Sequence, residues 1–228
     1  MKTLIIIPAY NEEKNIKRVV ENLIENFPQY DYIVINDGSS DKTEQVCMDN
    51  NFSYITLPVN LGLAGAFKTG MKYAYKNNYD VALQFDGDGQ HLPEHIKDME
   101  KCLEKEKAHI VIGSRFVNTK RKFSMRMLGN ILISCAIKLT TGKTIKDPTS
   151  GMRLFNKEMI EEFSKKINYA PEPDTISYLI KNGVKVSEVQ VNMTNRVAGE
   201  SYLNWSRSIK YMMYMFVSIM FIQFFRKR

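Results

Sequence analysis

Residues 81–91 read VALQFDGDGQH: an apolar run is followed by two aspartates one residue apart, each with a glycine after it. A short apolar run that ends in a glycine-rich polar stretch predicts a buried strand with a loop at its carboxyl end. The carboxylates of Asp86 and Asp88 then point into one small volume, where their repulsion is costly unless a cation neutralises it. The stretch therefore predicts either a divalent-cation site at a sheet edge or, as the alternative, an ordinary acidic turn.

The same alternation of strand, polar loop and helix occurs along most of the chain. Residues 4–7 and 32–35 are β-branched runs that end in the loops PAYNEE and NDGSSDKT, and a helical pattern follows each. Further expected elements are strands at 53–57, 110–112 and 185–191, a glycine-containing loop and helix within 60–77, and helices near 95–105 and 127–139. This order predicts an α/β fold with a mainly parallel sheet flanked by helices, whose ligands bind beyond the carboxyl ends of the strands. The loops 8–12, 36–37 and 86–90 should therefore meet in one crevice.

Composition limits the class of protein. The chain has 228 residues, 44% of them hydrophobic, which suits one packed domain, and its formal charge of +7 favours anionic partners. Its three cysteines are widely spaced and form no CxxC pair, so we expect reduced packing residues in the cytosol.

The C-terminus differs from the rest of the chain. Residues 209–225 are almost wholly apolar, aromatic or methionine, and the basic residues 226–228 follow them. A spanning helix needs about 20 apolar residues, so we expect a membrane-associated helix that lies on or partly enters the bilayer, with the basic tail at anionic headgroups. The alternative is a helix packed on the domain or in an oligomer interface. We divide the chain into a domain at 1–203 and this helix at 204–228.

Six motifs in order, IPAYNEE, VINDGSSD, DGDGQH, GSR, DPTSG and NRVAGES, resemble those of family 2 glycosyltransferases of the GT-A fold. They are most similar to the polyprenyl-phosphate glycosyltransferase branch, which includes the dolichol-phosphate mannose synthases, and the resemblance runs from about Thr3 to Leu203. It implies the GT-A, Rossmann-like form of the α/β fold. It also implies inverting transfer of a sugar from a nucleotide-diphosphate sugar to undecaprenyl or dolichyl phosphate at the cytosolic face of the membrane.

The family pattern implies roles for individual positions. The residues implied to bind the UDP- or GDP-linked donor are Pro8, Tyr10, Glu12, Ile35, Asp37, Asp86, Gly87, Asp88, Arg196 and Ser201. Mg²⁺ or Mn²⁺ is implied at Asp86, Asp88 and Gln90, where the two aspartates also have catalytic roles. Two departures from the pattern are Asn36, where many relatives carry the first aspartate of a DDGS motif, and Tyr202, where the mannose synthases commonly carry lysine. The second departure weakens the case for GDP-mannose as the donor.

The nature of the acceptor depends on how its nucleophilic oxygen becomes an anion. A sugar hydroxyl needs a base, whereas a lipid phosphate is already anionic and needs cations instead. Residues 115–126, RFVNTKRKFSMR, combine five cations, among them the catalytic candidates Arg115 and Arg126, with apolar side chains, as expected of a loop that meets phosphate at a membrane. A solvated loop and a nucleic-acid-binding segment are the alternatives.

Three of the acidic residues after this basic segment are candidates for a role in the site. Asp147, in the DPTSG motif, either orients Arg115 or Arg126 or caps a turn. If the acceptor is instead a hydroxyl of a lipid-linked glycan, Asp174 is the candidate catalytic base. Otherwise Glu172 and Asp174 cap the helix that follows them and complement its dipole.

Other classes of function remain as alternatives. A non-catalytic, membrane-bound adaptor that binds a nucleotide sugar is one of them, although the intact aspartates and arginines argue against it. Nucleic acid is not an expected partner, because no nucleic-acid-binding module accompanies the basic residues. A homo-oligomer or a small membrane partner would complete a short membrane anchorage.

Overall fold

The computed structural model describes residues 1–119, 125–194 and 205–225. The strands in these ranges are β1 (Thr3–Ala9), β2 (Asp31–Asn36), β3 (Tyr54–Thr56), β4 (Val81–Gln84), β5 (Ile110–Ser114), β6 (Arg153–Asn156) and β7 (Val186–Gln190). The α-helices are α1 (Ile16–Asn26), α2 (Thr43–Asp49), α3 (Gly62–Lys76), α4 (Ile96–Glu106), α5 (Met125–Thr141), α6 (Lys157–Lys165), α7 (Pro173–Lys181) and α8 (Trp205–Met220). Two short 3₁₀ helices are η1 (Pro93–His95) and η2 (Ile222–Phe225).

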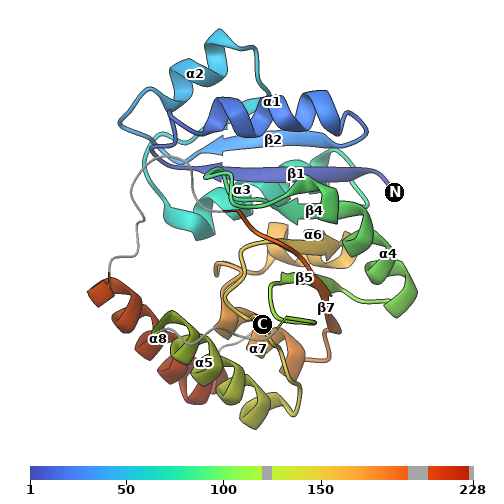
Figure 1. Cartoon of the computed structure of the whole chain (residues 1–228), viewed down its shortest axis with the longest axis vertical. Helices are drawn as coiled ribbons and strands as arrows, with labels where there is room; N and C mark the ends of the chain where they lie inside the picture. The colour runs from blue at the N-terminus through green and yellow to red at the C-terminus, as the bar shows by residue number, and fades with distance from the viewer. Residues whose placement is uncertain (120–124, 195–204, 226–228) are drawn as a thin grey trace.

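The described strands form one mixed sheet in the order β3-β2-β1-β4-β6-β5-β7 (Figure 1). β1 pairs in parallel with β2 and β4, β2 pairs in parallel with β3, and β5 pairs in parallel with β7. The predicted mainly parallel α/β sheet is therefore confirmed. The exception is β6, which runs antiparallel to both β4 and β5 and was not expected from the sequence. Its direction brings the loop before Arg153 to the carboxyl end of β4.

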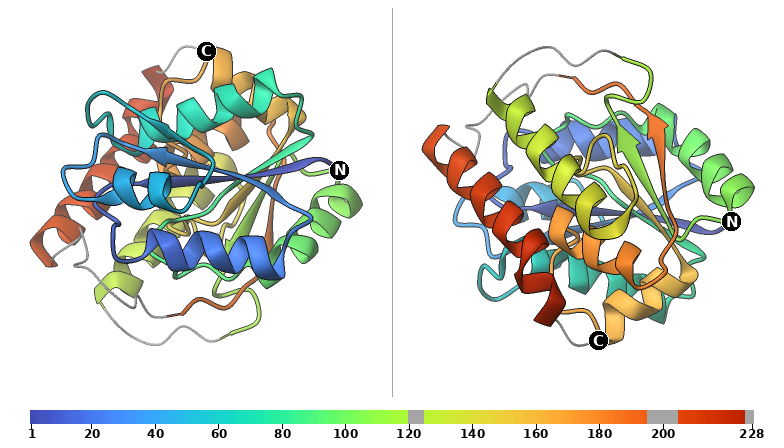
Figure 2. Two further views of the ribbon diagram at one scale, coloured as in Figure 1. Left: turned by 90° about the horizontal axis from the view of Figure 1, so that it is seen from above. Right: turned by 90° about the horizontal axis from the view of Figure 1, so that it is seen from below.

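Helices cover both faces of the sheet (Figure 2). The alternation of side chains along β1 sends Leu4 and Ile6 to one face and Ile5 and Ile7 to the other, and all four are fully buried. α1, α2 and α4 pack on the face of Ile5 and Ile7. The helices α3, α5, α6, α7 and α8 pack on the face of Leu4 and Ile6.

The C-terminal helix α8 lies beside α5 and α7 (Figures 1 and 2). Its Met215 and Ile219 are buried in the same core as the sheet, and a Cβ at Gly129 of α5 would lie only 1.4 Å from Met212 Sδ. In the described ranges, no helix has the length and apolar character needed to cross a bilayer. The structure thus shows that this helix packs on the domain, while its contact with a membrane and the proposed boundary between residues 203 and 204 stay predictions.

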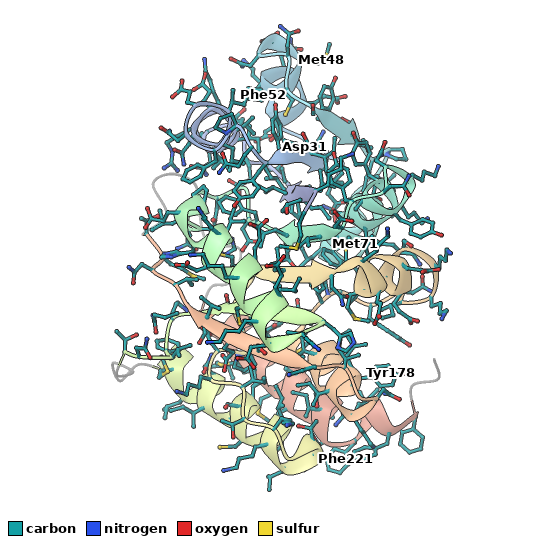
Figure 3. The ribbon with its side chains drawn as sticks, turned by 90° about the vertical axis from the view of Figure 1, so that its right-hand side faces the viewer. Asp31, Met48, Phe52, Met71, Tyr178 and Phe221 are labelled. Carbon is teal, nitrogen blue, oxygen red and sulfur yellow. The ribbon has the colours of Figure 1, made fainter. Side chains whose placement is uncertain are left out.

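The outer side of this helix pair remains apolar. Exposed large hydrophobic side chains on α5, α8 and the residues after α8 are Leu128, Ile131, Leu132, Leu139, Met213, Tyr214, Val217, Phe221, Ile222, Phe224 and Phe225. We call this set the α5/α8 face. Figure 3 labels Phe221, which lies at the periphery of the molecule and is 61% exposed.

Candidate active site

The loops predicted to share a crevice meet at the carboxyl ends of β1, β2 and β4. The backbone N–H of Asp37, after β2, donates to the carbonyl of Ala9, at the end of β1 (2.9 Å). Gly87 lies against the end of β1, because a Cβ at that position would be 3.2 Å from the carbonyl oxygen of Pro8. A glycine there allows the aspartate loop to approach the β1 backbone closely.

The two aspartates of this loop are held by local hydrogen bonds. The backbone N–H of Asp86 donates to Nδ1 of His91 (3.0 Å), and His91 Nε2 lies 3.5 Å from Asp86 Oδ2. Asp88 Oδ1 accepts from the backbone N–H of Gln90 (3.0 Å), across Gly89 with its left-handed φ of 77°. The Asp86 side chain is 40% exposed, whereas His91 is buried. His91 therefore shapes the loop from beneath, a role that its spacing in the sequence did not reveal.

The segment after β7 is attached to the same loop. Thr194 donates from its backbone N–H to the carbonyl of Gln90 (3.0 Å) and from its hydroxyl to the carbonyl of Gly89 (3.0 Å). Arg196 and Ser201, the donor-binding candidates of the last motif, follow Thr194 but lie outside the described residues. The described backbone thus places Thr194, the residue before this motif, against the aspartate loop.

On the other side of the loop, the DPTSG motif forms an ion pair. Arg115 donates from Nε to Oδ2 of Asp147 (2.7 Å) and from Nη2 to Oδ1 (2.8 Å), and Asn130 of α5 donates to the same carboxylate (2.9 Å). Asp147 is fully buried, and its hydrogen bonds raise the pKa of Arg115. Of the two roles predicted for Asp147, the structure shows the orientation of Arg115. The side chain of Arg126 lies outside the described residues.

The loop before β6 touches the first aspartate directly. A Cβ at Gly151 would lie 2.5 Å from Asp86 Oδ2, so only glycine leaves room for the carboxylate there. The next strand begins with Arg153, which is 3% exposed and, like Phe155 two residues further on, lies on the face of the sheet that α5, α7 and α8 cover. Burial lowers the pKa of this guanidinium, and the charges of Glu172 and Asp86 oppose that shift. A buried arginine at this place was not expected from the sequence, because the strand that carries it was not recognised.

The predicted nucleoside-binding residues differ in their exposure. Tyr10 is 44% exposed at the end of β1, and Glu12 is half-buried beside it. Asp37 is 4% exposed, and its Oδ1 accepts from the backbone N–H of Leu61 (2.8 Å). Ile35 is fully buried within the core, so its side chain does not line the crevice. The role of Ile35 is thus to pack the end of β2 from below.

Asp174, the candidate base, lies inside the contact between α7 and α8. It is 3% exposed, Oδ2 accepts from the hydroxyl of Ser218 (2.7 Å), and Oδ1 accepts from the backbone N–H of Thr175 (2.7 Å). A carboxylate in this position stabilises the first turn of α7, which agrees with the alternative reading as a helix-terminal residue. An exposed carboxylate for deprotonating an acceptor is not found at Asp174.

The oxygen atoms of the aspartate loop suit a hard divalent cation. Asp86 and Asp88 supply carboxylates and Gln90 an amide, all from one short loop. Within the described ranges, no cluster of three or more His, Cys, Asp or Glu side chains would hold a metal ion by itself. Mg²⁺ characteristically binds through one or two carboxylates and takes its remaining ligands from water and substrate phosphates, so these residues fit it.

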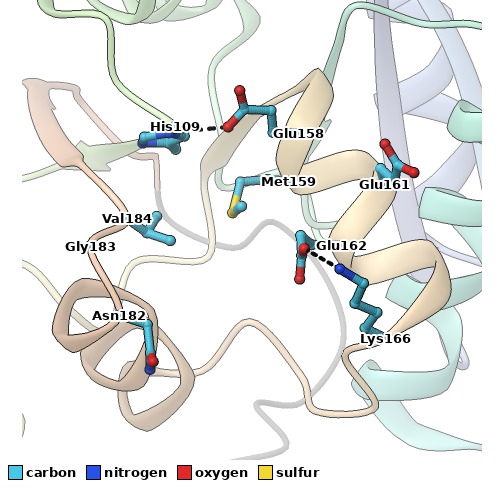
Figure 4. Close-up of a pocket in the computed structure, with 9 residues that line it drawn as sticks. All are labelled: His109, Glu158, Met159, Glu161, Glu162, Lys166, Asn182, Gly183 and Val184. Atoms are coloured by element: carbon cyan, nitrogen blue, oxygen red, sulfur yellow. Dashed lines mark hydrogen bonds and ion pairs between the residues drawn. The ribbon is translucent and has the colours of Figure 1, made fainter. Parts of the chain in front are cut away.

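Figure 4 shows a pocket of about 380 Å³, which lies near the amino ends of β5 and β7. Its lining residues are His109, Glu158, Met159, Glu161, Glu162, Lys166, Asn182, Gly183 and Val184. His109 and Val184 stand before the first residues of β5 and β7, whereas the aspartate loop follows the last residue of β4. The cavity contains none of the predicted site residues and is separate from the crevice.

Comparisons with known proteins agree with this arrangement. The sequence profile described as "Glycosyl transferase family 2" matches residues 4–164. The UDP-N-acetylglucosamine–dolichyl-phosphate N-acetylglucosaminyltransferase of Methanococcus voltae is 32% identical over 210 residues, with 82% of this chain and 83% of the relative covered. The polyprenol monophosphomannose synthase of Mycolicibacterium smegmatis is 30% identical over 220 residues, with 90% and 82% covered.

A solved structure has the same fold. The glucosyl-3-phosphoglycerate synthase of Mycobacterium tuberculosis, in complex with Mn²⁺, UDP-glucose and phosphoglyceric acid, aligns with a TM-score of 0.69 at 17% identity. The alignment covers 96% of this chain and 79% of that chain. At this level of identity the likeness shows the shared fold.

Proposed function

The chain belongs to glycosyl transferase family 2, and on this premise we propose that it transfers a sugar from a nucleotide-diphosphate sugar to polyprenyl phosphate. One observation carries the proposal: the loop before β6 contacts Asp86 of the aspartate loop through Gly151, and its buried Asp147 orients the guanidinium of Arg115. A cation site for a diphosphate and a fixed cation for a second phosphate are what this reaction requires. The relatives from M. voltae and M. smegmatis, named for dolichyl-phosphate and polyprenol substrates, support this acceptor class.

On the donor side, Asp86, Asp88 and Gln90 would hold Mg²⁺ or Mn²⁺. When bound, the ion supplies positive charge that stabilises the departing diphosphate. The exposed ring of Tyr10 is available to stack on the base of a UDP- or GDP-linked donor, and Arg196 is proposed to bind the diphosphate.

On the acceptor side, Arg115 binds and orients the lipid phosphate. Its pKa is raised by Asp147, so it stays charged at every physiological pH. A phosphate oxygen then attacks the anomeric carbon in line, and the bond from that carbon to the diphosphate oxygen breaks as the new bond forms, which inverts the configuration. The anionic nucleophile needs no base, and the burial of Asp174 under α8 supports this acceptor over a glycan hydroxyl.

The reaction is tested by incubating the purified protein with undecaprenyl phosphate, Mn²⁺ or Mg²⁺ and a panel of UDP- and GDP-sugars, followed by mass spectrometry of the lipid extract. We expect a lipid-linked monosaccharide joined through an acid-labile phosphodiester, and no product when the ion is omitted. Asp88→Asn should lower turnover by about 100-fold or more, whereas the exposed Asp98→Asn on α4 should not lower it.

Two outcomes would contradict the proposal. Transfer only to a hydroxyl of a lipid-linked glycan would move the function to the second acceptor class. Binding of a donor without turnover by any acceptor would favour the adaptor instead.

We also propose that the α5/α8 face rests on the cytosolic surface of the membrane. Both helices adjoin the site, because Asn130 of α5 holds Asp147 and α8 packs over α7. A polyprenyl chain is insoluble in water, so a site that uses it needs an apolar surface nearby.

The exposed thiol of Cys135 on α5 can be used to test whether the α5/α8 face contacts the membrane. Vesicles with anionic lipid should slow its modification by a maleimide, whereas Cys102 of α4, on the other face of the sheet, should react at an unchanged rate. Equal rates at Cys135 with and without vesicles would contradict membrane contact. Slow modification without vesicles, in a sample that is dimeric by light scattering, would instead show that a second copy covers the face.

A further inference from the structure

The C-terminal helix makes a polar contact with the interior of the molecule close to the site. Tyr211, on the inner side of α8, donates its hydroxyl to a carboxylate oxygen of Glu172, the residue at the start of α7. Burial raises the pKa of Glu172, and the hydrogen bond from Tyr211 together with the charge of Arg153 lowers it. The net pKa of Glu172 stays above its ordinary value, so the hydrogen bond from Tyr211 and the charge of Arg153 favour the carboxylate against the effect of burial.

Glu172 is one of the acidic residues whose charge acts on the buried Arg153. The Arg153 guanidinium donates from Nη2 to the carbonyl of Pro148 (2.7 Å), and among the described residues its Nε has no hydrogen-bond partner. A buried guanidinium with unused donors is costly unless nearby carboxylates balance its charge. The charges of Glu172, Asp86 and Asp147 all raise its pKa against the effect of burial.

Arg153 is adjacent to the group that holds Asp86. Its cross-strand partner on β4 is Gln84, whose side-chain nitrogen lies 3.5 Å from Asp86 Oδ1. Gly151, two residues before Arg153, contacts the other oxygen of the same carboxylate. The charges of Asp86 and Glu172 thus both act on the buried guanidinium of Arg153, and only Asp86 also belongs to the proposed metal loop.

We propose that Tyr211 is a positioning residue of the sugar transfer: by holding Glu172 as the counter-charge of Arg153, it leaves the Asp86 carboxylate available to the divalent cation. Without that hydrogen bond, the Glu172 side chain is held less firmly and its charge balances Arg153 less well. Arg153 then interacts more with Asp86, so the divalent cation and the guanidinium compete for the Asp86 carboxylate. The inference rests on the proposed function, and it makes α8 a part of the catalytic unit as well as of the α5/α8 face.

The test compares Tyr211→Phe with Ser218→Ala. Each substitution removes one hydroxyl group of α8 that donates a hydrogen bond to an acidic residue at the start of α7. Tyr211 donates to Glu172, whereas Ser218 donates to Asp174, which is not among the charges that act on Arg153. We expect Tyr211→Phe to raise the Mn²⁺ concentration for half-maximal turnover by about tenfold. Its kcat should recover at saturating Mn²⁺, and its KM for undecaprenyl phosphate should stay within about twofold of the wild type. Ser218→Ala should lower the melting temperature to a similar degree and leave the Mn²⁺ dependence unchanged.

Direct Mn²⁺ binding, measured by electron paramagnetic resonance on the full chain without substrates, gives a readout besides activity. Tyr211→Phe and Glu172→Gln should both weaken binding, and the double variant should be no weaker than Glu172→Gln alone, because the hydroxyl acts through the carboxylate. Equal Mn²⁺ binding by the wild type and both single variants would overturn the inference, as would a wild type that binds no Mn²⁺. A wild type that binds Mn²⁺ but makes no lipid-linked sugar would instead refute the proposed function alone.

Discussion

Replacing Asp147 by asparagine tests the ion pair on which the acceptor side of the site depends. The carboxylate is fully buried and accepts two hydrogen bonds from the guanidinium of Arg115, one from the Arg115 backbone N–H and one from Asn130. Asparagine keeps the size of the side chain but removes its charge and one of its two acceptor oxygens. The substitution therefore breaks the pair without creating a cavity.

The expected decrease in the free energy of unfolding follows from the burial of Asp147. Removing one partner of a buried ion pair costs about 3–5 kcal/mol. The Arg115 side chain is 39% exposed, so water restores part of its solvation and we expect about 2–3 kcal/mol. In a domain of this length, 1 kcal/mol lowers the melting temperature by about 2–4 °C, which predicts a decrease of about 4–12 °C. Transfer to undecaprenyl phosphate should fall by about tenfold or more, because Arg115 is no longer oriented.

Thermal unfolding followed by circular dichroism, with lipid-linked product measured in parallel, checks both effects. Glu161→Gln is the matched control, because it removes the carboxylate of an exposed ion pair with Lys165 (2.7 Å) and should leave the melting temperature unchanged. A melting temperature of Asp147→Asn within about 1 °C of the wild type, with full transfer activity, would refute the reasoning.

Three shorter predictions follow from close contacts and burial. Gly151→Ala places a Cβ 2.5 Å from Asp86 Oδ2, so the carboxylate must move; we expect at least about tenfold weaker Mn²⁺ binding, measured by electron paramagnetic resonance. Burial raises the pKa of the Cys47 thiol to about 11. Cys135 is exposed, so it is not the packing residue that we expected from the sequence. At pH 8 a thiol reagent should therefore label Cys135 in the native protein and Cys47 only after unfolding. Gly70→Ala in α3 places a Cβ 2.3 Å from a buried β1 side chain, and overpacking should cost about 1–3 kcal/mol in urea unfolding.

The elements that were predicted from sequence are those with a strong local signal. The strands β1, β2 and β4 are apolar runs with polar loops after them, and the convergence of those loops follows from the parallel direction of the strands. β6 escaped prediction because it has only four residues and begins with a buried arginine, Arg153, which gives no hydrophobic period. His91 was left without a role for a related reason, since its contact with Asp86 depends on how the loop folds back.

By itself, the sequence determined the α/β alternation, the aspartate loop at a strand end and the family of the chain, because propensity, hydrophobic period and motif order are local properties. The tertiary structure alone decided the antiparallel course of β6, the pairing of Arg115 with Asp147 and the contact of Tyr211 with Glu172. In each case the partners are far apart in the chain, so no local pattern specifies their contact, which forms only when the surrounding core brings them together and excludes water.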